Sequence, residues 1–239
     1  MNREYHHWHS AALERDMELL IFGHAGARVL VFPTSQGRFF EWEDRRMFEA
    51  VRDPIERGLL QFVCVDSVDA ESWYCTWAHP AGRANRHAQY DRYLVEEVLP
   101  FFAGRNTNPY LMTLGASFGG YHAMNFGLRH PDHVNRILAF SGLYDIRRFV
   151  GEYYDDNVYF NNPVDFIPNE NSAERLALLR RQDIIVAAGR DDRLMASAQR
   201  LSGALWAKGI GNALREWDGW AHDWPYWEKM LQLYISGHD

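Results

Sequence analysis

Short apolar runs alternate with longer amphipathic segments along most of the 239 residues, and no other feature constrains the fold as strongly. Apolar runs of strand length, bounded by turn residues, predict strands at residues 17–22, 28–32, 60–65, 110–114, 136–140, 184–188 and 213–217. Helical periodicity occurs at residues 39–57, 83–99, 172–181, 193–208 and 224–236, and from the turn at 115–120 to about 130. Nearly continuous apolar strands separated by helices indicate an α/β fold, with a mostly parallel central sheet and helices on both faces.

One segment, residues 145–171, breaks this rhythm. It holds Phe, Tyr, Asn, Asp and two Pro without a clear period. A long irregular segment inside a compact domain is usually functional. We therefore expect a single domain over residues 1–239 with a small lid-like insertion. The insertion follows the sixth strand if residues 6–9 are counted as an N-terminal edge strand.

Composition argues against several classes of function. The formal net charge of −7 does not suit a nucleic-acid partner or an anionic membrane surface. No apolar run reaches the roughly 18 residues that could span a membrane, and the first residues lack a secretion pattern, so we expect a cytoplasmic protein. Cys64 and Cys75 are then reduced thiols, too few to hold zinc alone. His7 and His9 would share one face of a strand, but a solvent-facing edge strand is the simpler interpretation, so we expect no metal.

A G-x-S-x-G motif, Gly115 to Gly119, is the strongest chemical signal. It directly follows the strand-like run 110–114 and opens a helix, which is the setting of a nucleophile elbow. Small residues beside Ser117 let the strand and the helix approach closely, and the turn exposes the hydroxyl. The motif therefore predicts Ser117 as a nucleophile; the alternative is a glycine-rich turn without chemistry.

A serine nucleophile needs a base and an orienting carboxylate, which follow it in the order Ser, Asp or Glu, His. His222 is the candidate base because it follows the last predicted strand, and open sheets place ligands at the carboxyl ends of their strands. Asp191 and Asp192 both follow the strand 184–188. The residues alone leave the acid open, since Asp191 could orient the base while Asp192 caps the next helix. Asp145 is a third candidate.

Two backbone N–H groups should form an oxyanion hole. Phe118, the residue after the nucleophile, should supply one, and the loop after the strand 28–32 the other. Pro33 has no N–H, so the second donor is Ser35, Thr34 or Gln36.

Aromatic residues form a cluster after the strand 60–65. They either line a substrate pocket or pack in the core, since aromatic side chains serve both ends. With the residue two positions before His222, they are our candidate substrate-binding residues: Trp73, Tyr74, Trp77 and Trp220.

Several segments together resemble a known family. They read Gly-Ala-Ser-Phe-Gly-Gly-Tyr-His-Ala-Met at 115–124, Arg-His-Pro-Asp at 129–132, Ala-Phe-Ser-Gly-Leu-Tyr-Asp at 139–145 and Ala-His-Asp-Trp-Pro-Tyr-Trp at 221–227. They resemble the "Putative esterase" family of α/β-hydrolases, which includes esterase D-like S-formylglutathione hydrolases, feruloyl esterases and mycolyltransferases. The resemblance implies an α/β-hydrolase fold and a Ser-His-acid triad, with Ser117 as nucleophile and His222 as base. The family's acid commonly stands three residues after a glycine such as Gly189, which favours Asp192 over Asp191.

These observations lead to the expectation of a serine esterase that acts on a small-molecule ester through an acyl-enzyme intermediate. An acyltransferase or thioesterase is an alternative, because the acyl-enzyme is common to all three. A non-catalytic α/β-hydrolase-like binding protein is another. The resemblance implies no cofactor, and the sequence leaves homo-oligomerisation open.

Overall fold

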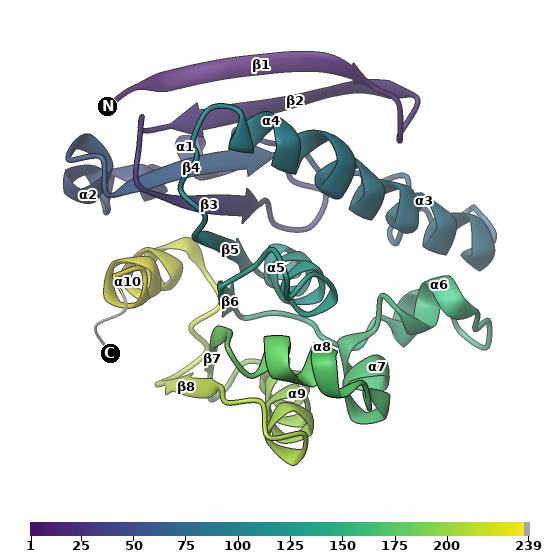
Figure 1. The fold of residues 1–239 in the computed structure, drawn as a ribbon. Coiled ribbons are helices and arrows are strands. Elements are labelled where there is room, and N and C mark those ends of the chain that lie inside the picture. Colours follow the sequence, from purple (N-terminus) through teal and green to yellow (C-terminus); the bar gives the residue numbers. More distant parts are fainter. Residues whose placement is uncertain (237–239) are drawn as a thin grey trace.

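Eight strands form one sheet within residues 1–236, the part of the chain that this computed structural model describes. Their order across the sheet is β1-β2-β4-β3-β5-β6-β7-β8 (Figure 1). β1 and β2 are antiparallel, as are β2 and β4, whereas every neighbouring pair from β4 to β8 is parallel. The predicted mostly parallel sheet is therefore confirmed. The strands are β1 (Arg3–Ser10), β2 (Arg15–Phe22), β3 (Ala27–Phe32), β4 (Leu60–Val65), β5 (Leu111–Ala116), β6 (Arg136–Phe140), β7 (Asp183–Gly189) and β8 (Ala213–Trp217).

Both faces of the sheet are buried at its central strands, whose side chains alternate between two cores. In β3, Leu30 and Phe32 belong to one core, and Val29 and Val31 to the other. Figure 1 shows α5 and α9 on one side of the sheet and α2 and α10 on the other. The helices are α1 (Glu41–Asp44), α2 (Arg52–Glu56), α3 (Pro80–Tyr93), α4 (Leu99–Ala103), α5 (Phe118–Arg129), α6 (Asp156–Tyr159), α7 (Pro163–Asn169), α8 (Ala173–Leu179), α9 (Met195–Ala207) and α10 (Trp224–Tyr234), with the 3-10 turns η1 (Met47–Glu49) and η3 (Arg147–Phe149) and the π-helical η2 (Leu94–Val98).

Residues 39–57 do not form the continuous helix that their periodicity predicts. They form α1, η1 and α2, because Arg46 has a left-handed backbone (φ 56°) that an α-helix of L-residues does not accommodate. The periodicity was nevertheless informative about burial, since Trp42, Phe48 and Ile55 all lie in the same core.

The segment after β6 leaves the sheet, where the break in periodicity predicts an insertion. It contains η3, α6 and α7. Side chains from η3 to α6 join a third, smaller core with Trp73, Phe118 and Tyr121. The insertion therefore packs against the first turn of α5, and its lid-like role stays a prediction.

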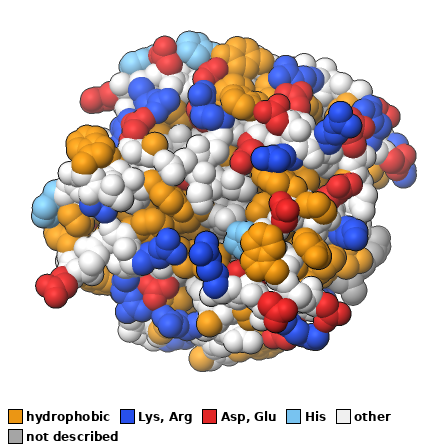
Figure 2. Space-filling model, turned by 180° about the vertical axis from the view of Figure 1, so that it is seen from behind, with side chains coloured by type: hydrophobic (Ala, Val, Ile, Leu, Met, Phe, Trp, Pro, Cys, Tyr) orange, Lys and Arg blue, Asp and Glu red, His pale blue; other side chains and the backbone are white. Residues whose placement is uncertain are grey.

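The surface shown in Figure 2 carries acidic and basic side chains interspersed among hydrophobic ones. Among the helices of residues 1–236, none combines the length and the hydropathy needed to cross a lipid bilayer.

Candidate active site

Ser117 stands between β5 and α5 with a backbone that few non-glycine residues adopt (φ 54°, ψ −123°). The flanking glycines permit this turn. A Cβ atom on Gly115 would lie 2.0 Å from the carbonyl oxygen of Gly119, and one on Gly119 would lie 2.5 Å from that of Pro33. The Ser117 side chain does not cap α5, so its hydroxyl is available to another partner.

His222 lies in the loop between β8 and α10 and joins the serine to a carboxylate. Its Nε2 atom is 3.2 Å from Ser117 Oγ, and its Nδ1 atom is 2.8 Å from Asp192 Oδ2. A neutral imidazole that donates from Nδ1 to the carboxylate can accept the serine proton at Nε2. The three side chains meet because β5, β7 and β8 are parallel and present their carboxyl ends at one edge of the sheet.

Asp192 contacts both the imidazole and the backbone just before α9. Its Oδ2 atom accepts from His222, while its Oδ1 atom accepts from the Leu194 N–H at 2.9 Å, just before α9 begins. The side chain is fully buried. The loops after β7 and β8 also touch, since a Cβ atom on Gly189 would lie 2.1 Å from the carbonyl oxygen of Trp220. Backbone contact and carboxylate together therefore hold the imidazole in place.

The other two acid candidates make no hydrogen bond to His222 within residues 1–236. Asp191 is exposed, and its backbone N–H donates to Gly219. Asp145 accepts from Arg147 and from Arg200. The hydrogen bond from Arg147 lowers the pKa of Asp145 below its ordinary value. Asp192 is thus the carboxylate that the structure brings to His222.

Three backbone N–H groups after β3 are candidate oxyanion donors, and two of them are engaged. The Thr34 N–H donates to Glu41 Oε2 at 2.8 Å, and the Gln36 N–H donates to Asp69 Oδ2 at 3.0 Å. The Ser35 N–H has no acceptor within residues 1–236. Ser35 is therefore the candidate whose N–H is left for a ligand.

Phe118 presents the second unengaged N–H. It is the first residue of α5, and its N–H meets no acceptor in the described part of the chain. Tyr74 connects it to Ser35: the Tyr74 hydroxyl donates to Ser35 Oγ at 2.9 Å, and its ring meets the Phe118 ring edge-on with centroids 5.1 Å apart. Burial raises the pKa of Tyr74, so the phenol remains a donor at neutral pH. Tyr74 thus connects the loop of Ser35 to Phe118, the residue that follows Ser117.

Comparison with known proteins gives this geometry a family. A family model described as "Putative esterase" matches residues 10–233. The chain belongs to the "Putative esterase" family. It is similar to an acetyl esterase of Caldicellulosiruptor saccharolyticus, 29% identical over 133 residues, or 49% of this chain and 50% of that protein. The match therefore spans about half the length of this curated relative.

Solved structures show the same fold. A ferulic acid esterase has a TM-score of 0.79 and 19% identity, covering 98% of this chain and 96% of its own. An S-formylglutathione hydrolase from Agrobacterium tumefaciens has a TM-score of 0.75 and 16% identity, covering 99% and 94%. The predicted α/β-hydrolase fold and the predicted family are both confirmed.

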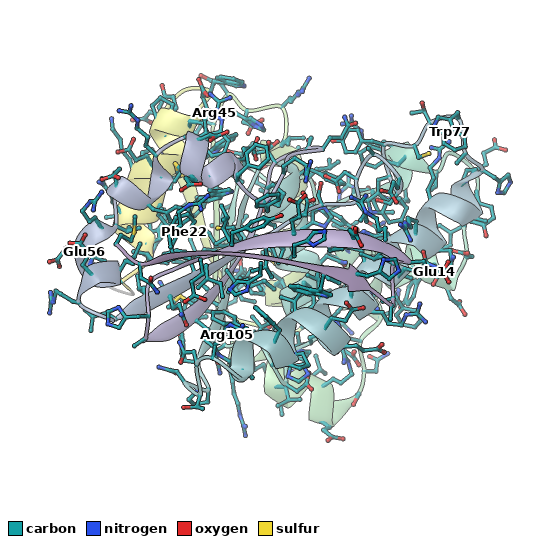
Figure 3. All side chains as sticks on the ribbon, turned by 90° about the horizontal axis from the view of Figure 1, so that it is seen from above. Glu14, Phe22, Arg45, Glu56, Trp77 and Arg105 are labelled. Carbon is teal, nitrogen blue, oxygen red and sulfur yellow. The ribbon has the colours of Figure 1, made fainter. Side chains whose placement is uncertain are left out.

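The four aromatic candidates of this esterase-family chain lie in different surroundings. Trp73 is 0% exposed and packs in the third core, and its predicted role in substrate binding stays a prediction. Trp77 is 89% exposed and projects at the end of the molecule where the turn at Glu14 also lies (Figure 3). Trp220 is 54% exposed and stacks on His222 with ring centroids 5.6 Å apart. Tyr74 and Trp220 are thus the two that reach the site.

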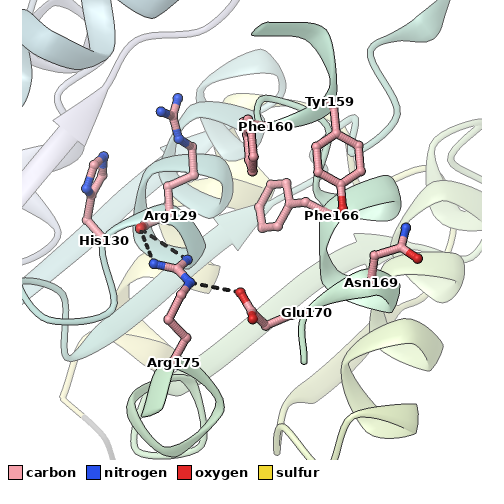
Figure 4. A pocket seen from close by; sticks show the side chains of 8 residues that line it. All are labelled: Arg129, His130, Tyr159, Phe160, Phe166, Asn169, Glu170 and Arg175. Carbon is pink, nitrogen blue, oxygen red and sulfur yellow. Dashed lines mark hydrogen bonds and ion pairs between the residues drawn. The ribbon is translucent and has the colours of Figure 1, made fainter. Parts of the chain in front are cut away.

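A cavity of about 290 Å³ opens beside the imidazole, lined by Asp191, Arg193, Trp220 and His222. A larger cavity of about 490 Å³ lies at the far end of α5, between Arg129, Phe160 and Phe166 (Figure 4). There the Arg175 Nε donates to Glu170 at 2.8 Å and its guanidinium reaches the carbonyl of Arg129. These polar groups connect α5, α7 and α8, and the lining of the larger cavity includes none of Ser117, His222 and Asp192.

Other polar residues near the site were not predicted from the sequence, namely Glu41, Asp69 and His122. The contacts of Asp69 join residues that are distant in the chain, since it lies 33 positions from Gln36 and 53 positions from His122. Glu41 lies only 7 positions from its partner Thr34. One signal was available, because Asp69 follows the carboxyl end of β4 as Asp192 follows that of β7.

The N-terminal histidines take part in ordinary polar pairs. His7 and His9 lie on β1 and both contact Asp16 across the hairpin, at 3.4 and 3.0 Å. Within residues 1–236, no three His, Cys, Asp or Glu side chains are grouped so that they could hold a metal ion.

Proposed function

We propose that this protein is a serine hydrolase that cleaves carboxylic esters, with Ser117 as nucleophile, His222 as base and Asp192 as orienting acid. One observation carries the proposal: the hydrogen-bonded chain from Ser117 Oγ to His222 and on to the buried Asp192. Membership in the "Putative esterase" family supports the same reaction.

Acylation begins when Ser117 Oγ attacks the ester carbonyl carbon and its proton passes to His222 Nε2. Asp192 accepts from Nδ1–H, keeps the required tautomer and stabilises the imidazolium that forms. The carbonyl oxygen becomes an oxyanion, bound by the N–H groups of Phe118 and Ser35. Collapse of this intermediate breaks the ester bond, and the alcohol leaves with the proton from His222.

Deacylation repeats these steps with water. His222 takes a proton from the water as the oxygen attacks the acyl carbon, and Ser117 leaves with the proton. An alcohol or thiol could replace water and turn the reaction into acyl transfer. The similarity to an acetyl esterase supports water as the acceptor and a short acyl group as the first substrate to test.

The test combines labelling and turnover on the same protein sample. We expect a fluorophosphonate to add one label, mapped by mass spectrometry to Ser117, and 4-nitrophenyl acetate to be hydrolysed. A folded protein with neither label nor turnover would contradict the proposal and favour a binding protein. Labelling with faster product release when an alcohol or thiol is added would instead indicate a transferase.

A further inference from the structure

The loop that carries Ser35 is held on both sides of that residue. On one side, Glu41 accepts from the Thr34 N–H at 2.8 Å and from the Thr34 hydroxyl at 2.7 Å. On the other, Asp69 accepts from the Gln36 N–H at 3.0 Å. Gln36 has a left-handed backbone (φ 56°) that usually favours glycine. The contact with Asp69 therefore holds a conformation that the chain would not readily keep by itself.

Asp69 also connects this loop to the helix of the nucleophile. Its Oδ1 atom accepts from His122 Nε2 at 2.8 Å, and both side chains are almost completely buried. His122 lies on α5, and its ring meets the Phe118 ring edge-on with centroids 5.0 Å apart. One carboxylate thus spans the two segments that supply the proposed oxyanion donors.

The Asp69 backbone makes a further connection. Its carbonyl accepts from the Tyr74 N–H at 2.9 Å, and the Tyr74 hydroxyl in turn donates to Ser35 Oγ. Asp69 therefore contacts the Ser35 loop in two ways: its side chain accepts from the Gln36 N–H, and its backbone carbonyl holds Tyr74, which donates to Ser35 Oγ.

Oxyanion donors are effective when they are held in place before the negative charge develops. The Phe118 N–H is held by α5, whereas the Ser35 N–H is on an irregular loop. We propose, on the basis of the proposed esterase function, that Asp69 is a positioning residue of the oxyanion hole, which engages Gln36 and His122 and so holds the Ser35 N–H opposite that of Phe118. Glu41 assists from the other side by engaging the Thr34 N–H.

The test compares Asp69→Ala, Asp69→Asn and a matched control, Asp91→Ala. Asp91 also accepts from a histidine at an end of α5, His130 Nε2, at 3.0 Å. That end is roughly 12 Å from His122 at the helical rise per residue. With 4-nitrophenyl acetate, we expect Asp69→Ala to lower kcat by about 100-fold with KM changed by less than about twofold, the result of losing an oxyanion donor.

Two further readouts separate positioning from a merely structural role. Phenylboronic acid forms a tetrahedral adduct on an active serine, and its affinity should fall in parallel with kcat in Asp69→Ala. Asp69→Asn should restore most of both values, because its amide oxygen can accept from Gln36 and its NH₂ can donate to a neutral His122. Asp91→Ala should leave kcat and boronic-acid affinity near wild type.

Several results would overturn the inference. The inference is wrong if Asp69→Ala and Asp91→Ala lose kcat equally. It is also wrong if Asp69→Ala raises KM and leaves kcat unchanged. If Asp69→Ala does not fold, Glu41→Ala and Glu41→Gln are measured instead. We expect kcat to fall in Glu41→Ala and to recover in Glu41→Gln. Unchanged kcat in both variants would refute the inference that Glu41 and Asp69 together position the Ser35 N–H. Failure of the esterase function is distinguishable, since wild type would then show neither turnover nor a Ser117 adduct.

Discussion

His222 Nε2 lies 3.2 Å from Ser117 Oγ, although 105 positions separate the two residues in the chain. The contact exists because β5, β6, β7 and β8 lie side by side and parallel, so the loops after β5 and β8 open at the same edge of the sheet. The loop after β7 lies between them and supplies Asp192.

Replacing the proposed nucleophile should abolish the reaction and leave the fold intact. Ser117→Ala should lower ester hydrolysis by about four orders of magnitude or more, as when a triad member is lost. Stability should change by less than about 0.5 kcal/mol, because the Ser117 side chain does not cap α5. Hydrolysis rates, fluorophosphonate labelling and thermal unfolding would measure this, and substantial remaining turnover would rule out Ser117 as nucleophile.

The two neighbouring aspartates should respond differently to the same change. Asp192→Asn should lower kcat by about 10³- to 10⁴-fold, because an amide does not hold the required imidazole tautomer. The Asn oxygen can still accept from the Leu194 N–H, so the start of α9 should be preserved. Asp191→Asn is the control and should stay within about threefold of wild type, since Asp191 is exposed. The opposite ranking in steady-state kinetics would move the acid to Asp191.

The tryptophan stacked on the base should affect the reaction, whereas an exposed tryptophan elsewhere should not. Trp220→Ala removes a ring whose centroid is 5.6 Å from that of His222. An aromatic pair contributes about 0.5–1.5 kcal/mol beyond area burial, so kcat/KM should fall roughly two- to tenfold. Trp77→Ala removes a ring that is 89% exposed and should have no measurable effect on kcat/KM. Equal losses in the two variants would contradict a role for the stack.

Acid stability should depend on a histidine outside the active site. Burial, aided by His122 and the charge of Arg129, lowers the pKa of His87 well below its ordinary value. The unfolded chain therefore binds a proton below about pH 6.5 while folded His87 stays neutral, and stability falls with acid by up to about 1.4 kcal/mol per pH unit. The dependence is absent above that pH.

His87→Phe tests this linkage. His87 Nε2 lies 3.2 Å from the Tyr121 hydroxyl. In the variant that hydroxyl still donates to the Asn161 carbonyl at 2.8 Å, so the buried phenol is not left unpaired. Urea unfolding between pH 7 and pH 5 should show a weaker loss of stability in the variant than in wild type. Identical slopes would show that other groups dominate the acid response.

Much of this molecule could be predicted from local patterns. Apolar runs located the strands of the parallel sheet, because a strand buried on both faces must be apolar along its length. The helical pattern at 39–57 predicted the burial of Trp42 and Ile55 but not the break at Arg46. Periodicity reports which side chains are buried, whereas the backbone angle of one arginine depends on what packs around it.

For the candidate site, too, local sequence pattern predicted some features, and others depended on contacts between distant residues. The sequence by itself determined the order of Ser117 and His222, and the position of each beside a strand end, because motif and periodicity are properties of neighbouring residues. Only the tertiary structure decided that Asp192 meets the imidazole, that no acceptor among residues 1–236 engages the Ser35 N–H, and that Trp73 is buried. Each of these depends on which distant loops converge at the edge of the sheet, and positions along a chain do not contain distances across it.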